Sequence, residues 1–153
     1  MLTLLPLIDS SFAEQQFALF QKYFVDKPFQ LTAIREYPFG TDGEGDVDAG
    51  PVICGLGGAA NIVGIAAFQQ NGYLKESYKL RNEVEGLAVP LRVSGGKRYF
   101  FGAMPMADAF LAWVNSFQAV PDAPAKTSTD WWLFHLLSML LLGCFFLVWR
   151  YLQ

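Results

Sequence analysis

The chain has 153 residues, enough for one modest core but not for a second large domain, because single domains commonly run to about 100–150 residues. Hydrophobic residues make up 53% of it and charged residues only 16%, against about 25% charged residues in a typical soluble protein. This balance predicts a chain that is attached to a membrane or is one part of a larger assembly. The formal net charge of −3 leaves no basic face, which excludes the electrostatic footprint of a nucleic-acid-binding protein.

The first predicted element is a helix over residues 12–25. Ser11 and Glu14 have the spacing of a capping box, which predicts that the helix begins there. Apolar side chains then recur at helical spacing and predict the core face: Ala13, Phe17, Phe20 and Phe24. Pro28 ends the helix, and a long polar, glycine-rich loop follows over residues 35–50.

Two further helices are predicted to form a hairpin. Residues 51–70 predict a helix that begins at Pro51 and is small or apolar on every side, so it must be buried. Residues 74–84 predict an amphipathic helix, and its core face consists of Ser77, Leu80 and Val84. Because only the Asn71-Gly72 link separates them, the two helices should form an antiparallel αα-hairpin.

The rest of the body predicts a β-hairpin and one more helix. Residues 91–101 alternate around glycines and predict a β-hairpin that turns at Gly95-Gly96. Pro105 begins a helix whose expected apolar face consists of Met106, Phe110, Trp113 and Phe117. Residues 119–130 are rich in proline, alanine and threonine, which predicts a linker without core residues.

The C-terminal segment predicts a membrane-spanning helix. Residues 131–149 contain no charge, and their number is close to the ~20 that a helix needs to cross a bilayer. Aromatic residues lie at both ends, as in the belts of membrane proteins: Trp131, Trp132, Trp149 and Tyr151. A soluble helix is rarely apolar on every face. We therefore expect a single transmembrane helix over residues 131–151, with the side of the membrane that the domain occupies left open.

The loop between the first two helices gathers acidic residues on alternate positions of "GTDGEGDVDAGPVICGLGGAAN": Asp42, Glu44, Asp46 and Asp48. An EF-hand calcium loop would need glycine at Val47 and glutamate at Ile53, so only an irregular calcium site stays open. Capping of the next helix explains one or two of the acids. A general acid/base pair also stays open, because alternate residues of an extended loop place Asp46 and Asp48 on the same side.

Cofactor and metal motifs are weak. The segment "GLGGAA", residues 55–60, matches G-x-G-x-x-A, but no convincing first strand precedes it, and close helix packing explains these glycines better. Cys54 and Cys144 give neither a disulfide framework nor a zinc site, because Cys144 lies within the predicted membrane span. We expect no cofactor and no metal site of a standard type.

Two stretches resemble one protein family. Residues 35–68, beginning "REYPFGTDGEGDVDAGP", resemble the Arg-Glu-Tyr-Pro, Gly-Asp-x-Asp-Ser-Gly-Pro and glycine-rich helix of bacterial membrane-associated α/α-toroid proteins related to linalool dehydratase/isomerase. Residues 101–116, "FGAMPMADAFLAWVNS", are similar to a later block of the same group. The resemblance implies a curved array of helical hairpins around a cleft, with the acidic loop at its mouth. A toroid of six hairpins needs a longer chain, so it also implies only the C-terminal part, with an open apolar flank.

The expected fold is therefore mainly α. Antiparallel helical hairpins of a partial α/α toroid and one small β-hairpin occupy residues 1–118, and a linker (119–130) and a C-terminal transmembrane helix (131–151) follow. The expected partners are the lipid bilayer and either a second polypeptide that completes the toroid or another copy of the chain, with no nucleic acid.

The expected function is that of a membrane-anchored helical module within a larger toroid assembly, without catalysis of its own. The alternative is a fragment of a lyase, an isomerase or a glycan-active enzyme. Its candidate catalytic residues are Asp46 and Asp48, with Glu44, Arg35 and Tyr37 in support. Ala49 replaces the serine usual in the group, and no histidine lies outside the membrane segment, so a full catalytic set is not carried over.

Overall fold

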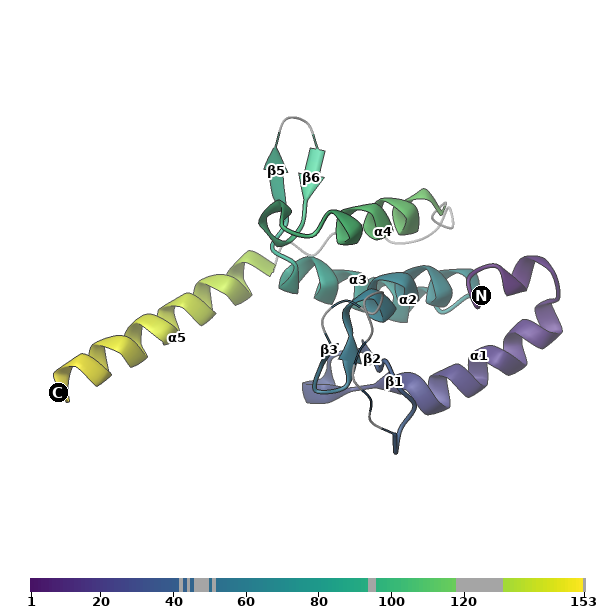
Figure 1. Cartoon of the computed structure of the whole chain (residues 1–153), viewed down its shortest axis with the longest axis horizontal. Coiled ribbons are helices and arrows are strands. Elements are labelled where there is room, and N and C mark those ends of the chain that lie inside the picture. The colour runs from purple at the N-terminus through teal and green to yellow at the C-terminus, as the bar shows by residue number, and fades with distance from the viewer. Residues whose placement is uncertain are drawn as a thin grey trace.

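The computed structural model describes residues 1–41, 43, 45, 50, 52–93, 96–117 and 131–152, and it is mainly helical (Figure 1). Its α-helices are α1 (Ser10–Phe24), α2 (Gly58–Gln70), α3 (Leu74–Leu87), α4 (Pro105–Ser116) and α5 (Trp131–Tyr151). Short 3₁₀ helices are η1 (Leu5–Leu7), η2 (Pro28–Gln30) and η3 (Phe100–Gly102). Antiparallel strand pairs are β1 (Val25–Asp26) with β2 (Ala33–Ile34), β3 (Val52–Ile53) with β4 (Leu56–Gly57), and β5 (Leu91–Val93) with β6 (Gly96–Arg98). The predicted mainly helical class is confirmed, with more small β-hairpins than the one expected.

Helix α1 begins two residues before its predicted start. Asp9 is its N-cap, because the Asp9 Oδ1 atom accepts a hydrogen bond of 2.9 Å from the backbone N–H of Phe12. The predicted capping box at Ser11 is therefore wrong. The predicted core face is confirmed, since Ala13 and Phe17 are buried and the two later phenylalanines pack against the core.

Helix α2 begins at Gly58 and not at Pro51 as predicted. The residues between them include the β3–β4 hairpin, in which Val52 pairs with Gly57. Gly55 turns the chain between the two strands with a φ of +78°, a conformation that glycine adopts without strain. The predicted end of α2 at Gln70 is confirmed. Its predicted burial is also confirmed, since the buried residues fall on several sides of the helix: Ile62, Gly64, Ile65, Ala66, Ala67 and Phe68.

Helices α2 and α3 pack side by side as the expected αα-hairpin (Figure 1). The Ser77 hydroxyl donates a hydrogen bond of 2.9 Å to the carbonyl of Ile65, which ties the two helices together in the core. Ser77 and Leu80 are buried and Val84 is partly buried, as the amphipathic pattern predicts. The link closes where the Tyr73 N–H donates to the carbonyl of Phe68.

Helix α4 packs on α2 through a face that only partly matches the prediction. Its buried residues are Ala107, Leu111 and Val114. Of the predicted face, Phe110 and Phe117 are partly buried against the core, whereas Met106 and Trp113 are exposed. This part of the predicted face is wrong because α4 carries two apolar stripes. The small Ala107 side chain favours the stripe that lets α4 approach α2 closely.

The β5–β6 hairpin is present, with a register that differs from the prediction by one residue. Val93 pairs with Gly96, so the strands are joined by residues 94–95 and not by Gly95-Gly96. The predicted linker, 119–130, lies outside the described residues.

Helix α5 spans the whole predicted C-terminal segment. It contacts the end of α3 at its own start and then extends away from the body (Figure 1). Large apolar side chains are exposed along it from Leu136 to Tyr151. Within the part of the chain that the structure describes, which omits several side chains of the first turns of α5, no helix meets the length and apolarity required to cross a membrane.

Candidate functional site

The predicted site is only partly within the described chain. Asp46, Asp48 and Glu44 lie outside the described residues. Arg35 and Tyr37 are described and follow β2, at the start of the acidic loop. The structure therefore gives the surroundings of the two supporting residues.

Arg35 is held from several directions, and its side chain is only 15% exposed. Its backbone N–H donates to the carbonyl of Phe24 at 2.8 Å. Its guanidinium lies 3.5 Å from the Asp26 carboxylate, donates from Nε to the carbonyl of Tyr37 at 3.3 Å, and stacks 5.1 Å above the Phe39 ring. Arg35 thus joins β1 to the loop after β2, which is a structural role.

Glycines allow the loops to approach Arg35 and Tyr37. A Cβ atom on Gly55 would lie 2.9 Å from the Arg35 Nη2 atom, and a Cβ atom on Gly43 would lie 2.6 Å from the Tyr37 ring. Both distances are shorter than a carbon atom tolerates, so a larger residue would push these side chains away. A reason for glycine in this segment is therefore close packing.

Asn61 is a positioning residue that the sequence analysis missed. Its Oδ1 atom accepts the N–H of Ile34 at 2.9 Å, and its Nδ2 atom donates to the carbonyls of Ile34 at 3.0 Å and Gly57 at 2.6 Å. Asn61 thereby acts as a pairing partner for β2 and also closes the first turn of α2. The available signal was a single polar residue in the otherwise apolar run "GAANIVGIAAF", since buried amides in such runs are almost always hydrogen-bonded.

A second polar cluster lies between α3, β6 and α4. The Tyr99 hydroxyl donates to the Glu85 Oε1 atom at 2.6 Å, and the Tyr99 N–H donates to the Asp108 Oδ1 atom at 2.8 Å. Lys97 pairs with Glu85, and Arg98 pairs with Asp108 at 3.2 Å. Burial, and then the neighbouring Glu85, raise the pKa of Tyr99, so its hydroxyl stays protonated near neutral pH and holds Glu85 in place.

Glu83 has the perturbed carboxyl group that most resembles an acid/base residue. Burial raises its pKa, against the opposing effects of the hydrogen bond from the Thr32 N–H and the charge of Lys79. The Thr32 N–H donates to Oε1 at 3.0 Å, whereas Oε2 is buried without a partner in the described structure. Perturbed pKa values are typical of active sites but also occur in structural networks. The hydrogen bond from the Thr32 N–H joins Glu83 of α3 to the residue before β2, which is a structural role.

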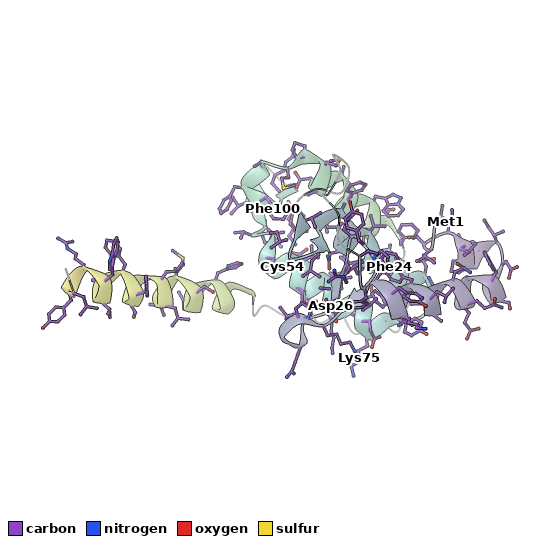
Figure 2. All side chains as sticks on the ribbon, turned by 60° about the horizontal axis from the view of Figure 1, so that its bottom comes forward. Met1, Phe24, Asp26, Cys54, Lys75 and Phe100 are labelled. Atoms are coloured by element: carbon purple, nitrogen blue, oxygen red, sulfur yellow. The ribbon has the colours of Figure 1, made fainter. Side chains whose placement is uncertain are left out.

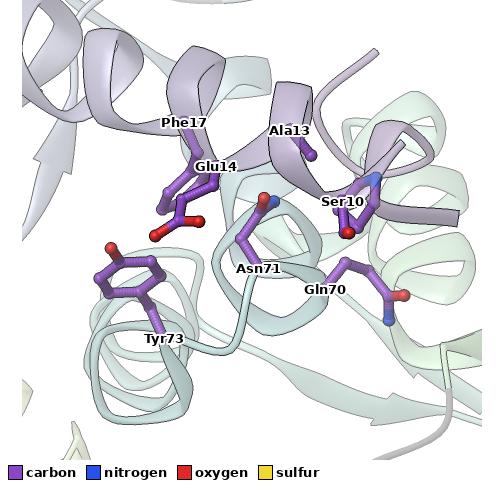
Figure 3. Close-up of a pocket in the computed structure, with 8 residues that line it drawn as sticks. Ser10, Ala13, Glu14, Phe17, Gln70, Asn71 and Tyr73 are labelled. Atoms are coloured by element: carbon purple, nitrogen blue, oxygen red, sulfur yellow. The ribbon is translucent and has the colours of Figure 1, made fainter. Parts of the chain in front are cut away.

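A pocket of about 260 Å³ lies between η1, the start of α1 and the α2–α3 link (Figure 3). In the close-up, the Glu14 carboxylate and the Tyr73 hydroxyl point toward one another (Figure 3). Arg35 and Tyr37 do not line this pocket. It contains one carboxylate and not the pair that general acid/base catalysis of the predicted kind requires.

Neither a metal site among the described residues nor a match to a known protein identifies a function for this chain. Among the described residues, no group of three or more histidine, cysteine, aspartate or glutamate side chains is placed to hold a metal ion. No family model, no curated protein and no solved structure matches the chain. The likeness to α/α-toroid proteins stays a prediction from the two sequence stretches.

Proposed function

We propose that the chain is a membrane-anchored helical module in which α5 inserts into the bilayer and the body takes part in a larger assembly of the α/α-toroid type. In this proposal the module has no catalytic activity of its own. The two parts of the proposal rest on different surfaces of the molecule, α5 for the anchor and the η1–α1 face for the assembly.

The exposure of α5 carries the proposal of an anchor. Phe145, Phe146, Leu147 and Val148 are all exposed, and because consecutive helical residues are about 100° apart, these four cover every side of the helix. Leu141, at the middle of the helix, is 72% exposed. A helix of 21 residues is about 30 Å long, the thickness of the hydrocarbon core of a bilayer. Lipid offers all of these side chains the apolar environment that water denies them.

Exposed apolar side chains on η1 and α1 support the assembly. The residues concerned are Leu4, Leu7, Ile8, Phe12 and Leu19. Because η1 and α1 are in contact, these exposed side chains lie on neighbouring elements, which we call the η1–α1 face, and they favour burial against a further helical hairpin from another polypeptide or another copy of the chain.

The absence of catalysis in this proposal follows from what the candidate side chains do. The Arg35 guanidinium forms an ion pair with Asp26 and donates a hydrogen bond to the Tyr37 carbonyl. The alternative, a fragment of a lyase, isomerase or glycan-active enzyme, rests on Asp46 and Asp48, and no observation among the described residues favours it.

Deletion of residues 131–153 tests the anchor. The truncated chain should leave the membrane pellet and enter the soluble fraction or aggregates, because the body lacks another apolar helix of this length in the described structure. Retention of the truncated chain in the membrane pellet would overturn the proposal.

A further inference from the structure

One end of the body is placed against the start of α5. The ring of His135 hydrogen-bonds to the carbonyl of Gly86, near the end of α3. Figure 1 shows η3 and the β5–β6 hairpin at this same end, and Figure 2 shows Phe100 on the side of the body nearest α5. A bilayer that contains α5 would therefore lie next to this end of the body.

This end exposes two large apolar side chains. Leu87, the last residue of α3, is 61% exposed, and Phe101 in η3 is 72% exposed. Phe101 also has a φ of +59°, a left-handed conformation that is uncommon for a bulky residue. Exposure of these two side chains to water is unfavourable, and an apolar environment next to η3 would bury them.

The same end carries three cationic side chains. Residues 91–98 contain Arg92, Lys97 and Arg98 and no acidic residue. The carboxylates that face them are Glu85, which pairs with Lys97, and Asp108, which pairs with Arg98. Arg92 is exposed and makes no ion pair within the described residues. With Lys97 and Arg98 paired, Arg92 leaves one positive charge in excess at this end, in contrast to the net charge of −3 of the whole chain.

We propose that Leu87, Arg92, Lys97, Arg98 and Phe101 form a lipid-contact surface that docks the body on an anionic bilayer. The proposal rests on the proposed anchoring by α5, which holds this surface next to the headgroups at high effective concentration. Arg92 binds the phosphate and carboxylate groups of anionic lipids, Lys97 and Arg98 lie beside it with their charges partly balanced by Glu85 and Asp108, and Leu87 and Phe101 enter the interface. Each cation near an anionic membrane strengthens such an association about fivefold.

Spin labels on the full chain test this surface. The chain, with Cys54→Ser and Cys144→Ser, carries one label at Phe101→Cys, Leu141→Cys or Lys75→Cys. It is reconstituted in vesicles of phosphatidylcholine alone or mixed equally with phosphatidylserine. Lys75 is the aqueous control, because it is exposed near the start of α3, about 18 Å along that helix from Leu87. Collisions with oxygen and with a water-soluble nickel complex report lipid and water at each label.

In the mixed vesicles the Phe101→Cys label should collide with oxygen more than with nickel, and the Lys75→Cys label should do the reverse. Arg92→Gln should lower the ratio of docked to free Phe101→Cys signal about fivefold, because one cation is lost. The matched change Lys75→Gln should leave that ratio unchanged.

The Leu141→Cys label separates the two proposals. If it reports lipid while Phe101→Cys is as accessible to nickel as Lys75→Cys, the anchor stands and the lipid-contact surface is wrong. If Leu141→Cys itself reports water, both proposals are overturned. Equal docking in vesicles of phosphatidylcholine alone would overturn the role of anionic lipid.

Discussion

Gly64 lies where α2 passes β2, and the space at this position decides how closely the two can pack. A Cβ atom on Gly64 would lie 1.9 Å from the Cδ1 atom of Ile34, which is itself buried. Gly64→Ala should therefore destabilise the chain by about 1–3 kcal/mol, although alanine is the better helix former. Chemical denaturation in detergent, followed by circular dichroism, measures this change.

Ile34→Val tests whether this contact causes the loss of stability, because it removes the Cδ1 atom that the Cβ of Gly64→Ala would meet. The double variant should recover most of the stability lost in Gly64→Ala, because the two positions are in contact and their effects should not add. Gly64→Ala with unchanged stability would show that the close approach is not important.

Tyr99→Phe removes the hydroxyl that donates to Glu85 from a residue that is almost fully buried. We expect a loss of about 1–3 kcal/mol, since hydrogen bonds to charged groups contribute more than neutral ones. Tyr23→Phe is the control, because the Tyr23 side chain is exposed and its hydroxyl makes no hydrogen bond in the described structure. Thermal unfolding of both variants measures the difference, and equal effects would contradict the assigned role of Tyr99.

Glu83 makes the stability of the fold depend on pH. Burial raises its pKa in the folded state, so protonation stabilises the folded form, and this contribution is lost as the pH rises through the raised pKa. The stability of the natural chain relative to Glu83→Gln should therefore increase as the pH falls from 7 toward 4.5, the ordinary value for this group. Denaturation of both proteins across this range measures the effect. A difference that is constant with pH would contradict it.

At the scale of elements, the N-cap of α1 distinguishes the structure from the sequence pattern. Asp9→Ala should cost about 1 kcal/mol, because it leaves the N–H of Phe12 without its acceptor. Ser11→Ala should have little effect, whereas the capping-box prediction would reverse the two results. Helical content and stability of the two variants decide between them.

Long elements with a clear period could be predicted from the sequence, and short ones could not. The spacing in α1 and α3 identified their buried faces because one apolar stripe dominates each helix. The β3 and β4 strands have two residues each, too few for any period to appear. The buried face of α4 depends on the approach of α2, which is a tertiary effect.

The candidate site was predictable only in part for the same reason. The segment before α2 was identified as unusual by its acids and glycines, and Arg35 and Tyr37 indeed meet glycines there. Asn61, which pairs with the backbone of Ile34 from 27 residues away, could not be assigned to that partner from local pattern. Its partner is defined only once α2 has packed on β2.

For the whole molecule, the proposed function depends on whether α5 lies in a bilayer. Its side chains are exposed on all sides, and its start contacts α3 through His135 and Gly86. The η1–α1 face lies at the end of the body that is far from α5 (Figure 1). Lipid can therefore cover α5 at one end of the molecule while a protein partner covers the η1–α1 face at the other.

Alkaline carbonate washing of membranes from cells that express the intact chain tests the anchor most directly, because it releases peripheral proteins and retains inserted ones. The intact chain should stay in the pellet. The variant that combines Leu141→Arg with Phe145→Arg should enter the supernatant, since each charge near the bilayer centre costs about 2.5–3.5 kcal/mol. The matched pair Leu7→Arg and Ile8→Arg should stay in the pellet. Release of the intact chain by carbonate would contradict the account.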